Sequence, residues 1–485
     1  MINSHKALFL SFLALMGFQI ACRAETPALL LDPGKSQGTW DGWGTSLCWW
    51  AKAFGDRDDI ADLLFTMKTV DFQGEKLPGL GMNIVRYNLG ACSWNEIDGR
   101  KMVTGKTIQP FRQMEGFWLD GKSDDPKSKS WDWSVDTNQR AMLQKAQDRG
   151  ANYFELFSNS PMWWMCRNDN PSGQAKPYQE NIVPGNYEKF ATYLATTARY
   201  AKDRWGITFT SVEPFNEPSA RYWIADGKQE GCYIGAKSQA AILPLLRAKL
   251  DERSLQDMPI AASDESTYDS AIATWQAFAP ATKALVQKVN VHGYQNAGGR
   301  RDLLSEIATK DGKQLWNSEY GEINGTGLKL TENLHLDFHY LRPTAWCFWQ
   351  PFDGKGWGAI MTDLPAKSFQ QINPKYFVFA QYARHIRPGM TILATGETET
   401  IAALDLKGRK LVIVVHNLSD KSREKIFDLS KFIVPDGAVS RWITEPNGST
   451  RYKEQRDMRV SGKRIDTNMP ALSVQTFEVE NITMP

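Results

Sequence analysis

Residues Ser211–Pro218 read "SVEPFNEP" and place two glutamates, each followed by a proline, at the end of an apolar run that begins at Ile207. Proline has no backbone N–H to give to a sheet, so a central strand should end near Glu213. Glu217 then lies just beyond the strand, while Glu213 lies within it. We therefore expect Glu217 to carry chemistry and Glu213 to belong to the structure of the strand.

This run is one of eight short apolar segments that are rich in β-branched and aromatic residues. Helix-like segments separate them, such as the one that Asp136 would cap and Gly150 would end. Strands that alternate with helices form parallel sheets, and eight such units predict an α/β fold, a (β/α)8 TIM barrel. The expected strands lie at 42–50, 81–89, 151–158, 207–215, 259–264, 284–292, 313–320 and 344–352.

A doubly wound open sheet is the structural alternative. Such a sheet usually has a glycine-rich phosphate turn after its first strand, and "GWGTSL" at 42–47 lacks the GxGxxG spacing. The barrel is the better interpretation of the alternation.

The sequence pattern changes after Arg387, where expected short strands and turns replace the alternating strands and helices. We expect an appended C-terminal β-sandwich domain at 387–485, joined by an N-terminal strand from 25–39. The catalytic barrel would then span 40–386. Residues 94–135 are rich in charges and turn residues and predict a long loop after the second strand, on the side where a barrel builds its site.

The N-terminus has the three regions of a signal peptide, which we place at 1–24: a basic start at Lys6, an apolar core and small residues near Ala24. The core is too short to anchor the chain in a bilayer. Export follows, to the medium, the periplasm or the cell surface. Lipidation of Cys22 is an alternative, because "IAC" partly resembles a bacterial lipobox, although Gln19 lies where that motif wants an aliphatic residue.

Composition excludes several classes of function. A net charge of +2 argues against a nucleic-acid partner, and the expected mature chain has no second apolar run long enough for a transmembrane span. The five cysteines that would remain after cleavage are widely spaced without CxxC, so no metal or other cofactor is expected and at least one thiol is unpaired. The oligomeric state is open, and we assume a monomer. Most of the 18 tryptophans are expected in the core. Their flat apolar faces are also surfaces on which sugar rings can stack.

A second glutamate has the same placement as Glu217. In "WNSEYGE" an apolar strand closes, Glu319 terminates it and Gly321 breaks it. Glu217 and Glu319 would thus lie at the ends of the fourth and seventh strands. Paired carboxylates across a cleft are what cleavage of a glycosidic bond needs, because one protonates the departing oxygen while the other attacks or activates water.

The motifs "FNEP", "WNSEYG", "SNSPMWW" and "NVHGY" resemble those of glycoside hydrolase family 30, a retaining family of barrel enzymes, over nearly the whole mature chain. Within the family, "GWGTSLCWWA" and "GANYFELFSNSP" are most similar to the endo-β-1,6-galactanases. The resemblance implies a secreted endo-acting enzyme that cleaves the β-1,6-galactan side chains of arabinogalactan by double displacement. Retention of configuration implies carboxyl groups about 5 to 5.5 Å apart.

The resemblance also implies roles for individual residues. Glu217 would be the acid/base and Glu319 the nucleophile, with Asn216 donating to the sugar 2-hydroxyl. Arg86, which interrupts an apolar strand, would lower the pKa of the nucleophile and keep it ionised. The remaining residues that the resemblance assigns to the site are Tyr294, as a hydrogen-bond donor to Glu319, His292, lining the cleft, and Trp163 and Trp349, as aromatic walls.

Three further tryptophans, at positions 49, 50 and 164, could form subsites or belong to the core. The glucosylceramidase-like members of the family carry an acidic residue a few positions after the second-strand arginine, where this chain has Ser93. That difference disfavours a lysosomal-type exo-glucosidase.

Other classes fit less well. A non-catalytic glycan-binding protein would usually have lost a carboxylate. His335 and His339 have ligand spacing for a metallohydrolase, but Leu336 stands where HExxH requires glutamate. A serine hydrolase would show a GxSxG turn, which is absent. The open alternatives are therefore other activities of the same family: β-1,6-glucanase, glucuronoxylanase or exo-β-glycosidase.

Overall fold

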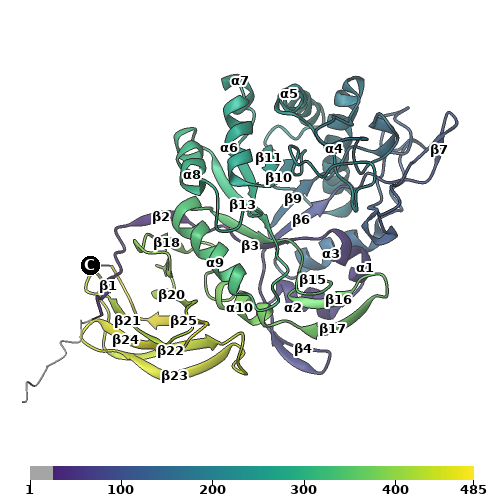
Figure 1. The fold of residues 1–485 in the computed structure, drawn as a ribbon. Helices are drawn as coiled ribbons and strands as arrows, with labels where there is room; N and C mark the ends of the chain where they lie inside the picture. Colours follow the sequence, from purple (N-terminus) through teal and green to yellow (C-terminus); the bar gives the residue numbers. More distant parts are fainter. Residues whose placement is uncertain (1–25, 485) are drawn as a thin grey trace, which may run out of the picture.

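Eight parallel strands form a barrel in the computed structural model, which describes residues 26–484 (Figure 1). Each strand pairs with its neighbour in the chain, and the last strand, β14, pairs with the first, β3. The ring closes between the fourth and fifth strands, where the backbone N–H of Val212 donates to the carbonyl of Pro259 at 3.0 Å. The predicted TIM barrel is confirmed. Its strands are β3 (Gly42–Ser46), β6 (Ile84–Asn88), β9 (Tyr153–Phe157), β10 (Ser211–Glu213), β11 (Ala261–Glu265), β12 (Lys288–His292), β13 (Gln314–Tyr320) and β14 (Ala345–Phe348).

The prolines end the fourth strand where the sequence predicts, since β10 stops at Glu213. The first strand is shorter than predicted and stops at Ser46, because Cys48–Phe54 form helix α1. The indole N–H of Trp50 donates to the carbonyl of Ser46 at 2.7 Å, which folds the aromatic run back onto the strand end. A short run of buried aromatic residues has the same sequence pattern in a strand and in a buried helix. Here the tertiary contacts decide in favour of the helix.

Helices surround the barrel strands on the outside (Figure 1). Asp136 precedes helix α3 as predicted, but it does not cap the helix with its side chain. Its carboxylate instead accepts hydrogen bonds from the side chains of Tyr87 and Gln139. The helices are α1, α2 (Asp58–Phe65), α3 (Thr137–Asp148), α4 (Tyr187–Tyr200), α5 (Ala236–Glu252), α6 (Tyr268–Ala277), α7 (Pro280–Ala284), α8 (Arg301–Lys310), α9 (Leu328–Leu336) and α10 (Pro374–Ala383), with π-turns η4 (Ala201–Trp205) and η5 (Asp337–Leu341).

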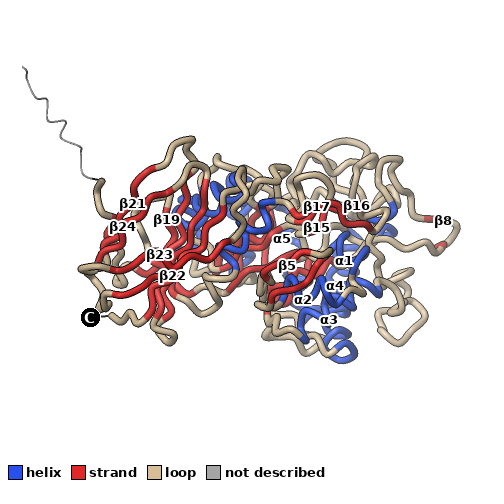
Figure 2. Tube along the Cα trace, turned by 90° about the horizontal axis from the view of Figure 1, so that it is seen from below, coloured by secondary structure: helices blue, strands red, loops and turns tan. Residues whose placement is uncertain are grey.

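Loops and small hairpins decorate the barrel. The predicted loop after the second strand contains only two short strands and one 3-10 turn, and Figure 2 shows loops gathering near its strand β8. The additions are β4 (Thr69–Phe72) with β5 (Glu75–Pro78), β7 (Glu96–Ile97) with β8 (Arg100–Lys101), β15 (Phe352–Asp353), β16 (Ile360–Asp363) and β17 (Ser368–Ile372), and the 3-10 turns η1 (Pro110–Arg112), η2 (Trp163–Met165) and η3 (Pro184–Asn186).

The C-terminal part forms two sheets that are largely antiparallel, as the sequence predicts (Figure 2). Both receive a strand from the N-terminal segment. The three-stranded sheet contains β1 (Leu29–Leu30), β21 (Arg423–Asp428) and β24 (Arg464–Met469). The seven-stranded sheet contains β2 (Ser36–Thr39), β18 (Thr391–Leu393), β19 (Thr400–Asp405), β20 (Lys410–Asn417), β25 (Ser473–Glu480), β22 (Gly437–Thr444) and β23 (Lys453–Val460).

The seven-stranded sheet packs against the barrel on one face and against the smaller sheet on the other. Alternate residues of β20 divide between the two cores: Val412 and Val414 join the barrel core, whereas Leu411 and Ile413 join the sandwich core. Side chains of a strand alternate between faces, so a continuous apolar run is what a sheet covered on both sides requires. The domain boundaries predicted from the sequence remain our interpretation of this arrangement.

The predicted signal peptide and Cys22 lie outside the described residues. Among residues 26–484, no helix is long and apolar enough to cross a membrane. The five cysteines of this part of the chain are all buried and free.

Candidate functional site

The carboxyl ends of the barrel strands bring Glu217 and Glu319 together. Glu217 follows β10 with a left-handed backbone, at φ 48°, a conformation that costs energy in a residue other than glycine. Two hydrogen bonds fix it there. Its N–H donates to the carbonyl of Asp264 at 2.8 Å, and its carbonyl accepts from the indole N–H of Trp223 at 2.8 Å. The backbone of Glu217 is thus held by the neighbouring strand and by its own loop.

A β-bulge aims Glu319 into the barrel. In the pairing of β12 with β13, Val291 lies opposite Asn317 and His292 opposite Glu319, so Ser318 is an extra residue. Because of this shift, two consecutive side chains point inward: Ser318 donates to Asp264 at 2.5 Å, and Glu319 accepts from Arg86 at 3.2 Å. Strict alternation would have turned one of them outward. The strand ends at Tyr320, the last residue of the predicted segment 313–320.

His292 lies between the two glutamates. Its Nδ1 is 3.2 Å from Glu217 Oε1 and 3.4 Å from Glu319 Oε1, and its Nε2 is 3.2 Å from Asp264 Oδ2. One carboxylate oxygen from each glutamate and the histidine nitrogen lie within 4.8 Å of one another. Tyr294 donates to Glu319 at 2.8 Å, which is the contact that the resemblance implies.

The same three residues, Glu217, His292 and Glu319, have the spacing of metal ligands. The guanidinium of Arg86 already occupies one oxygen of Glu319, and Tyr294 donates to the other. A cation placed there would face the charge of Arg86 at short range, so the donor set fits a hydrogen-bonded catalytic cluster better than a metal site.

Arg86 is the centre of a buried network of charges. Its guanidinium contacts three carboxylates, those of Glu155 at 2.9 Å, Glu319 at 3.2 Å and Asp264. Lys288 adds a second cation, 2.6 Å from Glu155. Every one of these side chains is at most 5% exposed. Buried charges are tolerated only when they are paired in this way.

Burial and charge oppose each other in setting the pKa values of the site. Burial raises the pKa of Glu319 to about 7, while the charges of His292 and Arg86 act to lower it. Arg86 thus acts on this pKa in the expected direction, but the net pKa is raised, because removing the carboxylate from water outweighs the cation. Burial acts to raise the pKa of Asp264, but Arg86 and His292 bring it below its usual range.

The protonation of His292 depends on its acidic neighbours. Burial acts to lower the pKa of this imidazole, but Glu319 and Asp264 raise it well above 6.5. A charged imidazole can donate from both ring nitrogens, toward Asp264 on one side and the two glutamates on the other. Its charge therefore favours ionised carboxylates on either side.

Glu213 lies in the wall of the barrel, close enough to the buried network to feel the charges of Asp264 and Arg86. It is fully buried, and one carboxyl oxygen accepts from the backbone N–H of Phe215 at 3.2 Å. Burial, with the negative charge of Asp264, raises its pKa well above 4.5. The two glutamates of "SVEPFNEP" thus have different surroundings, although they are four positions apart.

The structure places the predicted sugar-binding residues around the same mouth. Asn216 precedes Glu217, and its buried side-chain oxygen has no partner within the described part of the chain. Trp163 is fully buried and donates from its indole to Ser93 at 2.7 Å. Trp349 follows β14 and contacts the ring of Trp49 edge-on, at 5.3 Å between centroids. The roles of these side chains toward a sugar remain predictions.

Sequence reasoning missed four members of the site. Asp264, Glu155 and Lys288 each interrupt a buried strand with a charge, which is the signal that singled out Arg86 and which could have found them. The phenol of Tyr222 donates to Glu217 Oε2 and lies 3.3 Å from Ser266 Oγ. Nothing in the sequence indicated Tyr222, because its contact depends on how the loop after β10 folds.

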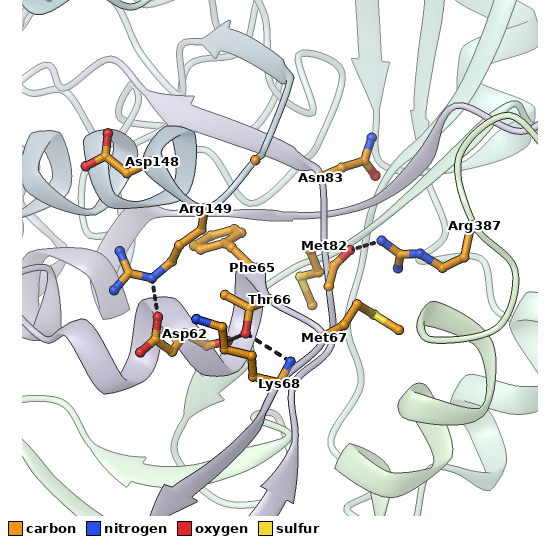
Figure 3. Close-up of a pocket in the computed structure, with 12 residues that line it drawn as sticks. Asp62, Phe65, Thr66, Met67, Lys68, Met82, Asn83, Asp148, Arg149 and Arg387 are labelled. Atoms are coloured by element: carbon orange, nitrogen blue, oxygen red, sulfur yellow. Dashed lines mark hydrogen bonds and ion pairs between the residues drawn. The ribbon is translucent and has the colours of Figure 1, made fainter.

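Two other features have a structural role. The Nδ1–H of His335 donates to the carbonyl of Thr398 at 3.0 Å, and its Nε2 lies 3.1 Å from the hydroxyl of Tyr382, so His335 ties the barrel to the sandwich rather than binding a metal. A cavity of about 650 Å³ lies at the opposite end of the barrel strands (Figure 3). There Arg149 pairs with Asp62, and Arg387 donates to the carbonyl of Gly81. Barrel enzymes carry chemistry at the other end, so this cavity is not the catalytic site.

A barrel whose fourth and seventh strands end in paired glutamates has the architecture of a glycoside hydrolase. The model of O-Glycosyl hydrolase family 30 matches residues 26–277. The chain is 48% identical over 482 residues to the Endo-beta-1,6-galactanase of Hypocrea rufa, covering 99% of this chain and 100% of that protein. The chain belongs to O-glycosyl hydrolase family 30 and is a glycoside hydrolase.

Solved structures agree on the fold. A conserved exported protein from Bacteroides fragilis has a TM-score of 0.75 at 19% identity, with 93% of this chain and 100% of that chain covered. The glycoside hydrolase family 30 subfamily 8 xylanase from Clostridium acetobutylicum has a TM-score of 0.69 at 18% identity, with 93% and 99% covered.

Proposed function

We propose that this glycoside hydrolase is an exported, retaining endo-β-1,6-galactanase that acts on β-1,6-galactan, including the side chains of arabinogalactan. The observation that carries the choice of substrate is the 48% identity with the Hypocrea rufa endo-β-1,6-galactanase along its full length. Solved structures below 20% identity support the barrel and sandwich alone. Export rests on the signal peptide predicted from the sequence.

The proposed mechanism is a double displacement by the two glutamates. Glu217 protonates the departing glycosidic oxygen, and Glu319 attacks the anomeric carbon to form a glycosyl-enzyme. Glu217 then removes a proton from the water that releases the sugar. Oxygens of the two carboxyls within 4.8 Å of each other support retention, because inverting enzymes need about 6.5 to 9.5 Å to hold a water between them.

The surrounding residues assist each glutamate. Arg86, 3.2 Å from Glu319, and Tyr294 favour the ionised nucleophile against the effect of burial. His292 contacts both carboxyls. Its positive charge can therefore stabilise the carboxylate of Glu217 once that residue has given up its proton and acts as the base. Asn216, which directly precedes Glu217, would donate from its side-chain amide to the sugar 2-hydroxyl. Trp349, which is slightly exposed, would form a wall of the subsite, and the fully buried Trp163 would support the site from within the protein.

A panel of oligosaccharides tests the proposal. The enzyme is given β-1,6-galacto-, β-1,6-gluco- and β-1,4-xylo-oligosaccharides, and the lengths of the products are recorded by chromatography. We expect internal cleavage of the galacto-series alone. Release of monosaccharide only would contradict endo action, and preference for another series would overturn the choice of sugar. NMR of the first product should show the β-anomer, and an α-anomer would contradict retention.

A further inference from the structure

Exposed aromatic side chains gather on one side of the barrel mouth. Among residues 26–484, four aromatic side chains are strongly exposed: Trp94 at 59%, Tyr178 at 59%, Tyr222 at 46% and Tyr340 at 43%. The first three lie on the loops that follow β6, β9 and β10, which are adjacent strands in the barrel. Tyr340 belongs to η5, which precedes β14 and lies away from the mouth.

The three loops are joined into one wall, which we call the aromatic wall and define as residues 89–136, 158–186 and 214–235. The N–H of Val103 donates to the carbonyl of Asp169 at 2.8 Å, and Arg100 pairs with the carboxylate of Asp169 at 2.8 Å. The N–H of Ala225 donates to the carbonyl of Gln174 at 2.8 Å. The hairpin of β7 and β8 projects from this wall beyond the barrel (Figure 1). The loops therefore present a connected surface.

The aromatic wall begins at the catalytic carboxylates. Tyr222 donates to Glu217, and Ser93, the neighbour of Trp94, accepts from the indole of Trp163. Its exposed rings thus extend from the point of cleavage toward the loops after β6 and β9. A glycan that is bound at Glu217 and continues along these loops would meet the exposed rings.

The chemistry of the wall suits a chain of sugars. A sugar ring has an apolar face that stacks on an aromatic ring and hydroxyls that remain in water, which matches exposed rings spaced along polar loops. The ring of Tyr178 also contacts Tyr233 edge-on, at 5.8 Å between centroids. A protein partner would require a contiguous apolar patch rather than separate rings. With a net charge of +2 over the chain, a strongly charged ligand is also disfavoured.

We propose that Trp94 and Tyr178 form outer subsites, which hold sugar residues of an extended glycan on the side of the mouth formed by the loops after β6 and β9, next to the sugars bound at Glu217 and Glu319. This inference rests on the proposed glycanase function and deepens it, because it names the surface that makes the enzyme prefer long chains. The wall contributes binding energy remote from the reacting bond, and this energy is available only to substrates that are long enough to reach it.

The test compares substrate length in three variants: Trp94→Ala, Tyr178→Ala and the control Tyr340→Ala. The value of kcat/KM is measured with oligosaccharides of increasing length, built from whichever linkage wild type cleaves in the panel above. We expect Trp94→Ala and Tyr178→Ala each to lower kcat/KM for the longest substrates about 3- to 10-fold. The shortest cleaved substrate should be unaffected, and Tyr340→Ala should match wild type at every length.

The outcomes separate this inference from the proposed function. Loss of the same factor on short and long substrates, or no loss at all, would overturn the outer subsites. Failure of wild type to cleave the galacto-series would overturn the galactanase proposal instead, and the length comparison would still be made with the linkage that is cleaved. Circular dichroism of each variant checks that the fold is retained, as expected for side chains that are mostly in water.

Discussion

The barrel mouth and the seven-stranded sheet bury their side chains by opposite means. At the mouth, Arg86 and Lys288 are surrounded by Glu155, Asp264 and Glu319, and each charge is offset by a partner at short range. In the sheet, strand β20 buries an unbroken apolar run that needs no partners. Apolar burial stabilises the fold, whereas buried ions at best compensate one another. The mouth is therefore built for chemistry rather than for stability.

The largest effect should come from the nucleophile. Glu319→Gln keeps the shape of the side chain but removes the attacking oxygen, so turnover should fall by about 10⁴-fold or more. The measurement is kcat on the cleaved oligosaccharide, with urea unfolding to check the fold. The matched control is Glu213→Gln, in which a carboxyl whose pKa is raised by burial becomes its neutral analogue. The control should keep its activity. If Glu319→Gln also kept its activity, Glu319 would not be the nucleophile.

The next effect separates buried from exposed ion pairs. Arg86→Met removes the cation that contacts three buried carboxylates, of which only Glu155 keeps a lysine partner, Lys288. We expect the free energy of unfolding to fall by about 4 kcal/mol. In the control, Lys145→Met, the pair with Asp58 is lost, but Asp58 is 67% exposed, so the change should stay below about 0.5 kcal/mol. Urea denaturation measures both. Equal effects would show that burial does not distinguish the two regions.

The sheet should respond in stability alone. Ile413→Ala creates a cavity in the sandwich core, and the free energy of unfolding should fall by about 3 kcal/mol. At temperatures where the variant is folded, kcat/KM should equal that of wild type. Leu406→Ala, at a side chain that is 53% exposed, is the control and should change neither quantity. A fall in kcat/KM of folded Ile413→Ala would mean that the sheet contributes to the geometry of the mouth.

A smaller effect depends on pH and tests the junction of the two regions. Glu478 accepts from His385 at 2.8 Å and pairs with Lys410 at 2.8 Å. Burial acts to raise the pKa of Glu478, but these partners lower it to about 2. Burial lowers the pKa of His385, so Lys410 is the permanent cation of the group. An acid with a lowered folded pKa stabilises the fold above its unfolded pKa.

Glu478→Gln should therefore lower the free energy of unfolding by about 2 kcal/mol at neutral pH. The difference from wild type should shrink as the pH falls from about 4.5 toward 2, because the carboxylate of wild type is protonated there. Urea denaturation across this range measures the difference. A difference that stays constant with pH would contradict the ionic origin of the effect.

The smallest effect concerns Tyr222. Tyr222→Phe removes the hydroxyl that donates to Glu217 but keeps the ring, so kcat/KM should fall about 5-fold, which corresponds to about 1 kcal/mol. The ring is 46% exposed and unfolding should be unchanged. Activity equal to wild type would show that this hydrogen bond does not assist the acid/base.

Much of the architecture could be predicted from the sequence, because it depends on local signals. The alternation of strands and helices predicts the barrel, and Pro214 and Pro218 predict the end of the fourth strand. The first strand was predicted too long, because "CWW" has no period that separates a strand from a buried helix. The bulge at Ser318 left no signal, although it decides that Glu319 faces the site.

The sequence by itself determined the two glutamates, the arginine and the histidine as candidates, because residue type and position at a strand end are properties of the chain. The tertiary structure decided their relations: that His292 contacts both carboxyls, that Tyr222 reaches Glu217 and that burial outweighs Arg86 in setting the pKa of Glu319. These are properties of distance and of the exclusion of water, which arise only when strands far apart in the sequence close into one barrel.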